Sequence, residues 1–163
     1  MDAHVSQCEE LGRLNGGSAM DATQAGNVAV VRRYYDACNA ADLGALLATL
    51  TPDAVHYFLP GRFKPVQGAE HFARYWVKNR KEFDARWSVD HVLAQGDEVV
   101  VEWSMFWTPK DAPRRIVTRG TEWYVMRGGR IAEVRAYFLS DSGGDTELAG
   151  FPYAQRGYPV VGA

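Results

Sequence analysis

Apolar residues recur every three to four positions in two stretches of the first half of the chain, which is the pattern of an amphipathic helix. The first stretch spans residues 24–39, and its recurring residues are Val28, Val31, Tyr35 and Cys38. In the second stretch, residues 69–83, the aromatic residues Phe72, Trp76 and Phe83 share one side, while charged residues occupy the other. Asp42 stands where an N-cap is expected, so a short additional helix is predicted from there to Leu50.

After residue 84 the pattern changes to runs rich in β-branched and aromatic residues, which predict strands. These strands are expected at residues 86–94, 98–108, 114–126 and 131–139, with tight turns at Gly96-Asp97 and Gly128-Gly129. A shorter strand is expected at residues 54–58. Helices that precede a run of antiparallel strands predict an α+β domain, in which a curved sheet folds over the helices and encloses a pocket.

The predicted elements all fall within residues 21–140, which we expect to form one domain. Residues 1–20 show little periodicity, so we expect a flexible arm, and Met20 is a second candidate start. Residues 141–163 are rich in glycine and contain Phe151-Pro152-Tyr153 and Gly157-Tyr158-Pro159. We expect this C-terminal tail to dock on the domain, either as a lid or at a dimer contact.

Charge and composition narrow the range of partners. The chain has 18 Lys and Arg against 20 Asp and Glu, and its basic residues are scattered, so nucleic acid is not expected as a partner. Cys8 and Cys38 form neither a disulfide framework nor a zinc spacing, and the four histidines show no metal spacing. We therefore expect no metal and a cytoplasmic location. Glycine motifs for phosphates or dinucleotides are missing, so no cofactor is predicted, and no apolar run approaches the ~18 residues of a membrane span.

The direction of one carboxylate, Glu122, depends on the register of the last predicted hairpin. With a two-residue loop at Gly128-Gly129, Glu122 lies opposite Arg135 and forms an ion pair on the solvent face. With a three-residue loop that includes Arg127, Glu122 lies opposite Val134, on an apolar face. The pattern alone leaves both registers open.

Two segments carry a resemblance to a known family. The order of elements, with YYDACNAADLGALLATLTPDAVHYFLPG at the front and GGRIAEVRAYF at the back, resembles the nuclear transport factor 2-like superfamily, particularly SnoaL-like proteins. The resemblance covers about residues 27–140. It implies a cone-shaped, curved antiparallel or mixed sheet wrapped around N-terminal helices, which is a cystatin-like α+β barrel.

The resemblance also implies roles for single residues. Tyr34 matches the first-helix tyrosine that ketosteroid isomerases place in their oxyanion hole, and Glu122 falls where those enzymes keep a protonated aspartic acid. The resemblance thus favours the three-residue turn and a Glu122 whose pKa is raised by an apolar cavity. Phe58 stands at the isomerase base position, so His56, on the same face, is the candidate replacement base. The epoxide hydrolases of the superfamily are not matched, since their last-strand aspartate falls at Ala136.

In the family register, the residues expected to line one cavity and contact the ligand are Phe58, Trp76, Trp103, Met105 and Phe138. Such a wall suits a small hydrophobic ligand. The expected function is cofactor-free proton transfer next to the carbonyl of an apolar or polyketide-like compound, as in an isomerase, cyclase or dehydratase. The rival is a non-catalytic small-ligand-binding or dimeric assembly domain. The outer sheet face expected to form a homodimer consists of Arg119, Thr121, Trp123, Arg135 and Tyr137.

Overall fold

The computed structural model of the protein describes residues 21–59, 63–110, 114–139, 141 and 143–162. Within these ranges the helices are α2 (Ala22–Ala40), α3 (Leu43–Thr49) and α4 (Ala69–Phe83), followed in the tail by a short 3₁₀ turn, η1 (Ala154–Arg156). The strands are β1 (Leu50–Phe58), β2 (Val66–Gln67), β3 (Arg86–Gln95), β4 (Glu98–Trp107), β5 (Ile116–Arg127) and β6 (Arg130–Phe138). The expected arm at residues 1–20, together with Cys8, lies outside the described residues.

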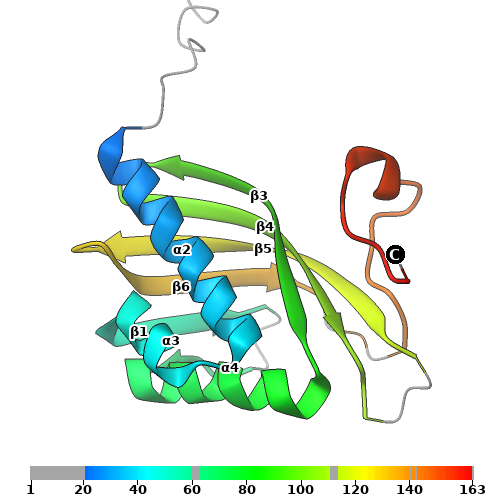
Figure 1. The fold of residues 1–163 in the computed structure, drawn as a ribbon, viewed down its shortest axis with the longest axis horizontal. Helices are drawn as coiled ribbons and strands as arrows, with labels where there is room; N and C mark the ends of the chain where they lie inside the picture. Colours follow the sequence, from blue (N-terminus) through cyan, green and yellow to red (C-terminus); the bar gives the residue numbers. More distant parts are fainter. Residues whose placement is uncertain (1–20, 60–62, 111–113, 140, 142, 163) are drawn as a thin grey trace, which may run out of the picture.

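The strands form one six-stranded mixed sheet in the order β2-β1-β6-β5-β4-β3. β1 runs parallel to β6, and the remaining neighbours are antiparallel. The sheet curves over α2 and α4, which lie on its concave side (Figure 1). The expected α+β fold with a curved, cone-like sheet is confirmed. The sheet is not closed, because β2 and β3 form its two edges.

Local sequence signals set the ends of the helices. Asp21 caps α2 through a capping box with Gln24, and Asp42 caps α3 by accepting a hydrogen bond from the N–H of Ala45 at 3.0 Å. α4 ends at Asp84, whose carboxylate is held by Arg80 and Arg115, both at 2.7 Å. The ion pair with Arg115 ties the C-terminal end of α4 to the residue just before β5.

β1 begins earlier than predicted. The expected helix up to Leu50 ends at Thr49, and the strand starts at Leu50 rather than Ala54. Pairing with β6 is interrupted between Leu50 and Val55, and Pro52 lies in this irregular stretch. A proline is tolerated there because the position needs no ladder hydrogen bond from its nitrogen.

The hairpin between β5 and β6 combines a two-residue turn with a bulge. Gly128 and Gly129 both have positive φ, 57° and 70°, and they connect the paired residues Arg127 and Arg130. The register then shifts, because Met126 pairs with Ile131 but Val125 pairs with Glu133. The extra residue on β6 is Ala132, which is the signature of a β-bulge.

The bulge decides the direction of Glu122. Beyond it, Glu122 lies opposite Ala136, so neither register considered from the sequence is correct. The expected three-residue turn is wrong. The apolar face was nevertheless the correct one for Glu122, because a two-residue turn plus one bulged residue restores the side-chain direction that the three-residue turn would have given. Glu122 is therefore 5% exposed.

The C-terminal tail lies on the outer face of the sheet, away from α2 and α4 (Figure 1). Arg119 holds it there, since its guanidinium donates to Glu147 and to the Pro159 carbonyl, the latter at 2.9 Å, and lies 4.1 Å from the centre of the Tyr153 ring. The N–H of Thr146 donates to the Val117 carbonyl at 2.9 Å. Arg119, expected on an open outer face, is thus covered by the tail.

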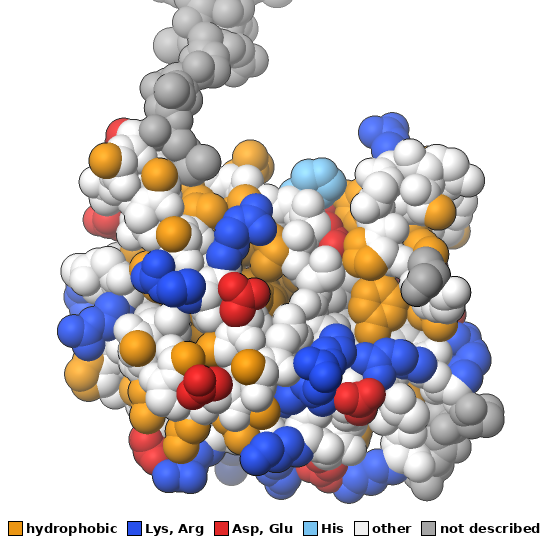
Figure 2. Space-filling view, viewed as in Figure 1, with side chains coloured by type: hydrophobic (Ala, Val, Ile, Leu, Met, Phe, Trp, Pro, Cys, Tyr) orange, Lys and Arg blue, Asp and Glu red, His pale blue; other side chains and the backbone are white. Residues whose placement is uncertain are grey.

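The side of the molecule seen in Figure 2 carries basic and acidic side chains interspersed with one another. Such mixing does not create the continuous positive field that attracts a phosphate backbone. The expectation that nucleic acid is not a partner stays a prediction.

We expect Arg119→Met to loosen the tail. The substitution removes the charged hydrogen bonds to Glu147 and Pro159, each worth about 2 kcal/mol when shielded from water, and keeps a similar side-chain volume. Urea unfolding should show reduced stability, and limited proteolysis should cut residues 143–162 faster. Arg135→Met, which removes a half-exposed guanidinium from the same face, is the matched control. Equal proteolysis rates in both variants would show that Arg119 does not hold the tail.

Candidate functional site

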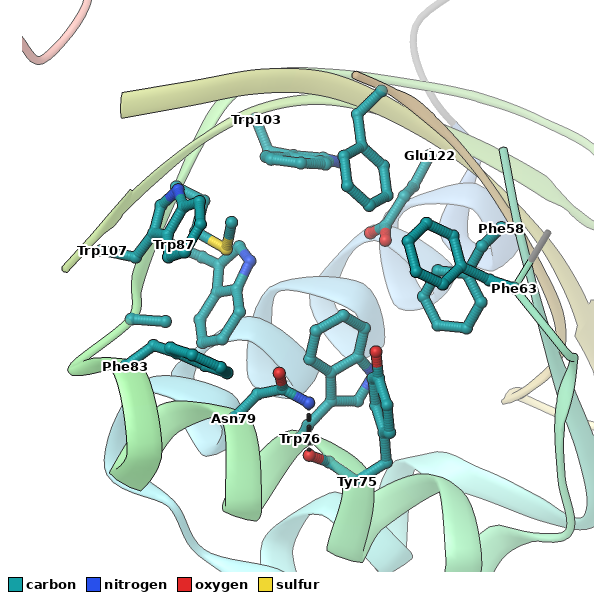
Figure 3. Close-up of a pocket in the computed structure, with 13 residues that line it drawn as sticks. Phe58, Phe63, Tyr75, Trp76, Asn79, Phe83, Trp87, Trp103, Trp107 and Glu122 are labelled. Carbon is teal, nitrogen blue, oxygen red and sulfur yellow. Dashed lines mark hydrogen bonds between the residues drawn. The ribbon is translucent and has the colours of Figure 1, made fainter. Parts of the chain in front are cut away.

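A cavity of about 270 Å³ lies between α4 and the concave face of the sheet (Figure 3). Side chains from α4 form one side, and side chains from β1, β3, β4, β5 and β6 form the other. The described residues that line it are Phe58, Phe63, Tyr75, Trp76, Asn79, Phe83, Ala85, Trp87, Trp103, Met105, Trp107, Glu122 and Phe138. All five residues expected to contact a ligand belong to this lining, and their role in binding stays a prediction.

Helix and strand periodicity explain the aromatic character of the lining. Tyr75, Asn79 and Phe83 recur four positions apart on α4 and so share one side of the helix. Trp103, Met105 and Trp107 alternate along β4 and share its concave face. The result is a space surrounded by rings.

Of the described lining residues, Glu122 is the one with a charged side chain. The Tyr35 hydroxyl donates to its Oε2 at 2.5 Å, and the Tyr124 hydroxyl donates to the same oxygen. His56 Nε2 lies 3.2 Å from Oε1. Three donors from α2, β1 and β5 therefore hold one buried carboxylate, while one edge of that carboxylate faces the cavity (Figure 3).

The donors keep Glu122 ionised. Burial alone raises the pKa of the carboxyl group, but the hydrogen bond and charge of His56 and the hydrogen bonds of Tyr124 and Tyr35 outweigh it, so the pKa lies below its usual value. The pKa values of Tyr35 and Tyr124 are raised by burial and by Glu122, so both hydroxyls keep their protons and donate. This direction is opposite to the raised pKa that we expected for Glu122.

The lowered pKa links folding to pH. A carboxyl group whose pKa is lower in the folded chain adds stability that is fully present above its unfolded pKa of about 4.3. That contribution is lost as the pH falls through the folded-state pKa of Glu122.

His56 is close to Glu122 but is not among the described residues that line the cavity. Its side chain is fully buried, and the Phe58 ring stacks on the imidazole at 4.2 Å between centres. Nδ1 has no hydrogen-bond partner among the described residues, so His56 uses Nε2 to contact Glu122. His56 was expected as the base, and the structure places it against Glu122 and outside the described lining, so its role as a base stays a prediction.

Tyr34 and Tyr35 differ in their contacts with Glu122. Tyr34 is buried among aromatic rings and interacts with Cys38, and the hydroxyl bonded to Glu122 is that of Tyr35. Tyr35 had been placed among the periodic core residues of its helix, so the sequence did show that it points inward. Tyr124 was missed, although it lies two residues after Glu122 and a strand directs such residues to one face.

Three further features bear on function: clusters that could hold a metal ion, helices that could cross a membrane, and the reactivity of the cysteine. Within residues 21–59, 63–110, 114–139, 141 and 143–162, no group of three or more His, Cys, Asp or Glu is arranged to hold a metal ion. No helix in this part of the chain combines the length and apolar character that crossing a lipid bilayer requires. Cys38 is buried, and burial raises the pKa of its thiol, which disfavours the reactive thiolate.

The sheet is open and curved, α2 and α4 lie on its concave face, and the cavity lies between α4 and the sheet. A match of the sequence to a family profile identifies the family that has this fold. The profile of the SnoaL-like domain covers residues 31–134. The chain belongs to the SnoaL-like domain family. The match includes His56, Glu122 and every described lining residue of the cavity except Phe138.

Solved structures agree with this fold. A protein of unknown function with a cystatin-like fold from Methylobium petroleophilum PM1 is 32% identical, with a TM-score of 0.65 over 84% of this SnoaL-like chain and 93% of its own. A hypothetical protein with a ketosteroid isomerase-like protein fold from Catenulispora acidiphila DSM 44928, in complex with trimethylamine, is 18% identical, with a TM-score of 0.63 over 80% of this chain and 93% of its own. An LEH-like epoxide hydrolase from M. tuberculosis is 19% identical, with a TM-score of 0.63 over 71% and 84%.

The last two similarities concern the fold alone. At this level of identity, one fold serves many unrelated activities, so activity has to be argued from the cavity itself. A comparison of this SnoaL-like chain with curated proteins finds no match.

We expect His56→Leu to raise the pKa of Glu122, because the substitution removes the hydrogen bond and the charge of His56 that favour the ionised carboxylate. Carbon NMR titration of the Glu122 carboxyl group measures the change, and Glu122→Gln identifies the signal. His91→Leu is the matched control, since it removes a histidine from an exposed pair with Glu102. A Glu122 pKa that stays the same in His56→Leu would contradict the assigned role of His56.

Proposed function

We propose that this SnoaL-like protein binds a small, mostly apolar carbonyl compound in its cavity and transfers a proton next to the carbonyl without a cofactor. The observation that carries the proposal is the position of Glu122. It is an ionised carboxylate in the lining of a mostly aromatic cavity, and donors from α2, β1 and β5 hold it in place. A positioned carboxylate that is ionised at neutral pH can accept a proton from a bound ligand, although with less driving force than one whose pKa lies near the working pH.

The proposed step moves one proton and one electron pair. Glu122 takes a proton from the carbon next to the carbonyl, and the C–H electron pair forms a C=C bond while the carbonyl oxygen takes the negative charge. Return of the proton from Glu122 to another carbon completes an isomerisation. Alternatively, the enolate carbon attacks a second carbonyl of the same molecule and closes a ring, as in a cyclase, and the alkoxide that forms takes the proton back from Glu122.

His56 has a supporting role in this scheme. It lies behind Glu122 rather than beside the ligand, and its hydrogen bond to Oε1 favours the ionised carboxylate. The same contact fixes the direction of the carboxyl group, because Oε1 and Oε2 are held by different elements, β1 on one side and α2 with β5 on the other. His56 is therefore a positioning residue for Glu122.

The shape and lining of the cavity support the ligand class. A space of about 270 Å³ surrounded by aromatic rings favours a flat, apolar molecule of one or two fused rings. An anionic ligand is disfavoured, because Glu122, the one charged side chain among the described lining residues, is itself an anion. A neutral ketone meets both conditions.

We expect Glu122→Gln to reduce proton transfer by about 10²–10⁴-fold, because an amide of the same size cannot act as a base. The measurement is hydrogen–deuterium exchange next to the carbonyl of β-tetralone, a neutral bicyclic ketone, followed by proton NMR in heavy water. Glu70→Gln, which changes an exposed carboxylate on α4, is the control. If wild-type protein binds β-tetralone without accelerating exchange, the protein is a binding domain for this ligand class and the catalytic proposal fails.

We also propose that two copies associate through the outer face of the sheet. Cross-strand pairing aligns one row of residues on that face, namely Leu93, Val100, Trp123, Arg135 and Tyr57. The Arg135 guanidinium lies over the Trp123 ring at 5.3 Å, and the large apolar members of the row are exposed. Aromatic residues and arginine are both enriched in protein interfaces.

Trp123→Glu should shift the protein to the monomer, because it places a charge at the centre of this row. Sedimentation velocity over a range of concentrations measures the change. Leu148→Glu introduces the same charge at an exposed leucine of the tail and should leave association unchanged. A wild-type protein that is monomeric at every concentration contradicts the proposal.

A further inference from the structure

The cavity presents a second functional group that the proposed reaction can use, the hydroxyl of Tyr75. Tyr75 belongs to α4 and lines the cavity. Figure 3 shows its ring rising from the helix, with the hydroxyl directed toward the side of the cavity where the Glu122 carboxylate lies. Glu122 comes from the sheet and Tyr75 from the helix, so the two groups approach the cavity from opposite walls.

The ring of Tyr75 is held in this direction by its neighbours. Trp76 packs edge-on against it with ring centres 5.0 Å apart, and Phe58 lies 5.6 Å from it at a tilt. The Asn79 amide donates to the main-chain carbonyl of Tyr75 at 2.8 Å, which ties the same turn of α4. The hydroxyl is therefore presented to the cavity by a packed, regular element, as precise positioning requires.

Four other donors of the lining are less suited to reach a ligand, which leaves the indole of Trp87 as the alternative to Tyr75. The indole nitrogens of Trp76 and Trp103 are buried within the wall. The indole N–H of Trp107 donates to Thr118 at 3.0 Å, and the amide nitrogen of Asn79 is engaged as described. The Tyr75 hydroxyl keeps its proton, because burial raises its pKa by more than the neighbouring Asn79 lowers it.

We infer that Tyr75 donates a hydrogen bond to the carbonyl oxygen of the ligand while Glu122 takes the proton from the adjacent carbon. The inference rests on the proposed function of the same cavity and adds to it the group that stabilises the enolate oxygen. Negative charge develops on that oxygen as the C–H electron pair moves, and a donor already aimed at it stabilises the transition state. The Tyr75 proton stays on its own oxygen, and the transferred proton travels through Glu122.

This assignment places the donor on a different element from the one expected. Tyr34, on α2, was expected to hold the ligand oxygen, but it is buried away from the cavity lining, and the neighbouring Tyr35 donates to Glu122 instead. The α2 tyrosines thus belong to the support of the base. The inference also selects the ligand, since the carbonyl oxygen must point toward α4 while its neighbouring C–H faces β5.

Tyr75→Phe tests the inference, because it removes the hydroxyl and keeps the ring in contact with Phe58 and Trp76. We expect exchange on β-tetralone to fall by about 10²–10³-fold in kcat, as is typical for the loss of one such donor. Tyr137→Phe removes an exposed hydroxyl from the outer sheet face and should leave exchange unchanged. Exchange that depends on Glu122 but is the same in Tyr75→Phe as in wild type would overturn the role of Tyr75 and leave the proposed function intact.

A binding experiment tests the hydrogen bond independently of turnover. Carbon NMR of β-tetralone labelled at the carbonyl carbon reports hydrogen bonding to the oxygen, and the bound signal should lie downfield of the free signal in wild type and in Glu122→Gln. In Tyr75→Phe this shift should be lost, whereas affinity for tetralin, which lacks the oxygen, should not change. A downfield shift that persists in Tyr75→Phe would assign the donor to another residue and refute the inference.

Discussion

The burial of one negative charge organises this SnoaL-like domain. Glu122 is 5% exposed, and its carboxylate is held by Tyr35 of α2, His56 of β1 and Tyr124 of β5. Without these donors, burial would favour the neutral acid, and the same side chain would have the opposite chemistry. The site therefore depends on how a helix, a parallel strand and a hairpin meet, because each provides one of the donors.

Much of the fold follows from local patterns in the sequence. The periodicity of residues 69–83 matches α4 in full, and Asp42 caps α3 as its position indicated. Two features had no strong local signal. β2 is two residues long, and the bulge at Ala132 depends on how β6 pairs with β5, which no single segment specifies. Glu122 was assigned to the correct face for an incorrect reason, because alternation determines a face only when every residue between the turn and the side chain is paired.

The candidate site was predictable in its walls and less so in its chemistry. Phe58, Trp76, Trp103, Met105 and Phe138 line one cavity, as alternation and the family resemblance indicated. The protonation of Glu122 depends on His56, which is 66 positions away in the chain, and on the choice between the adjacent tyrosines Tyr34 and Tyr35. Helical periodicity does not separate two neighbours that both point inward, so that choice requires coordinates.

One strand has separate duties on its two faces. Arg119 and Glu122 both belong to β5, but Arg119 binds the tail on the convex side of the sheet while Glu122 lines the cavity on the concave side. Because alternate positions of a strand are independent in what they contact, variation at 119, 121 or 123 can redesign the exterior while leaving the interior chemistry unaltered. Relatives that share this pocket are therefore free to differ in quaternary assembly.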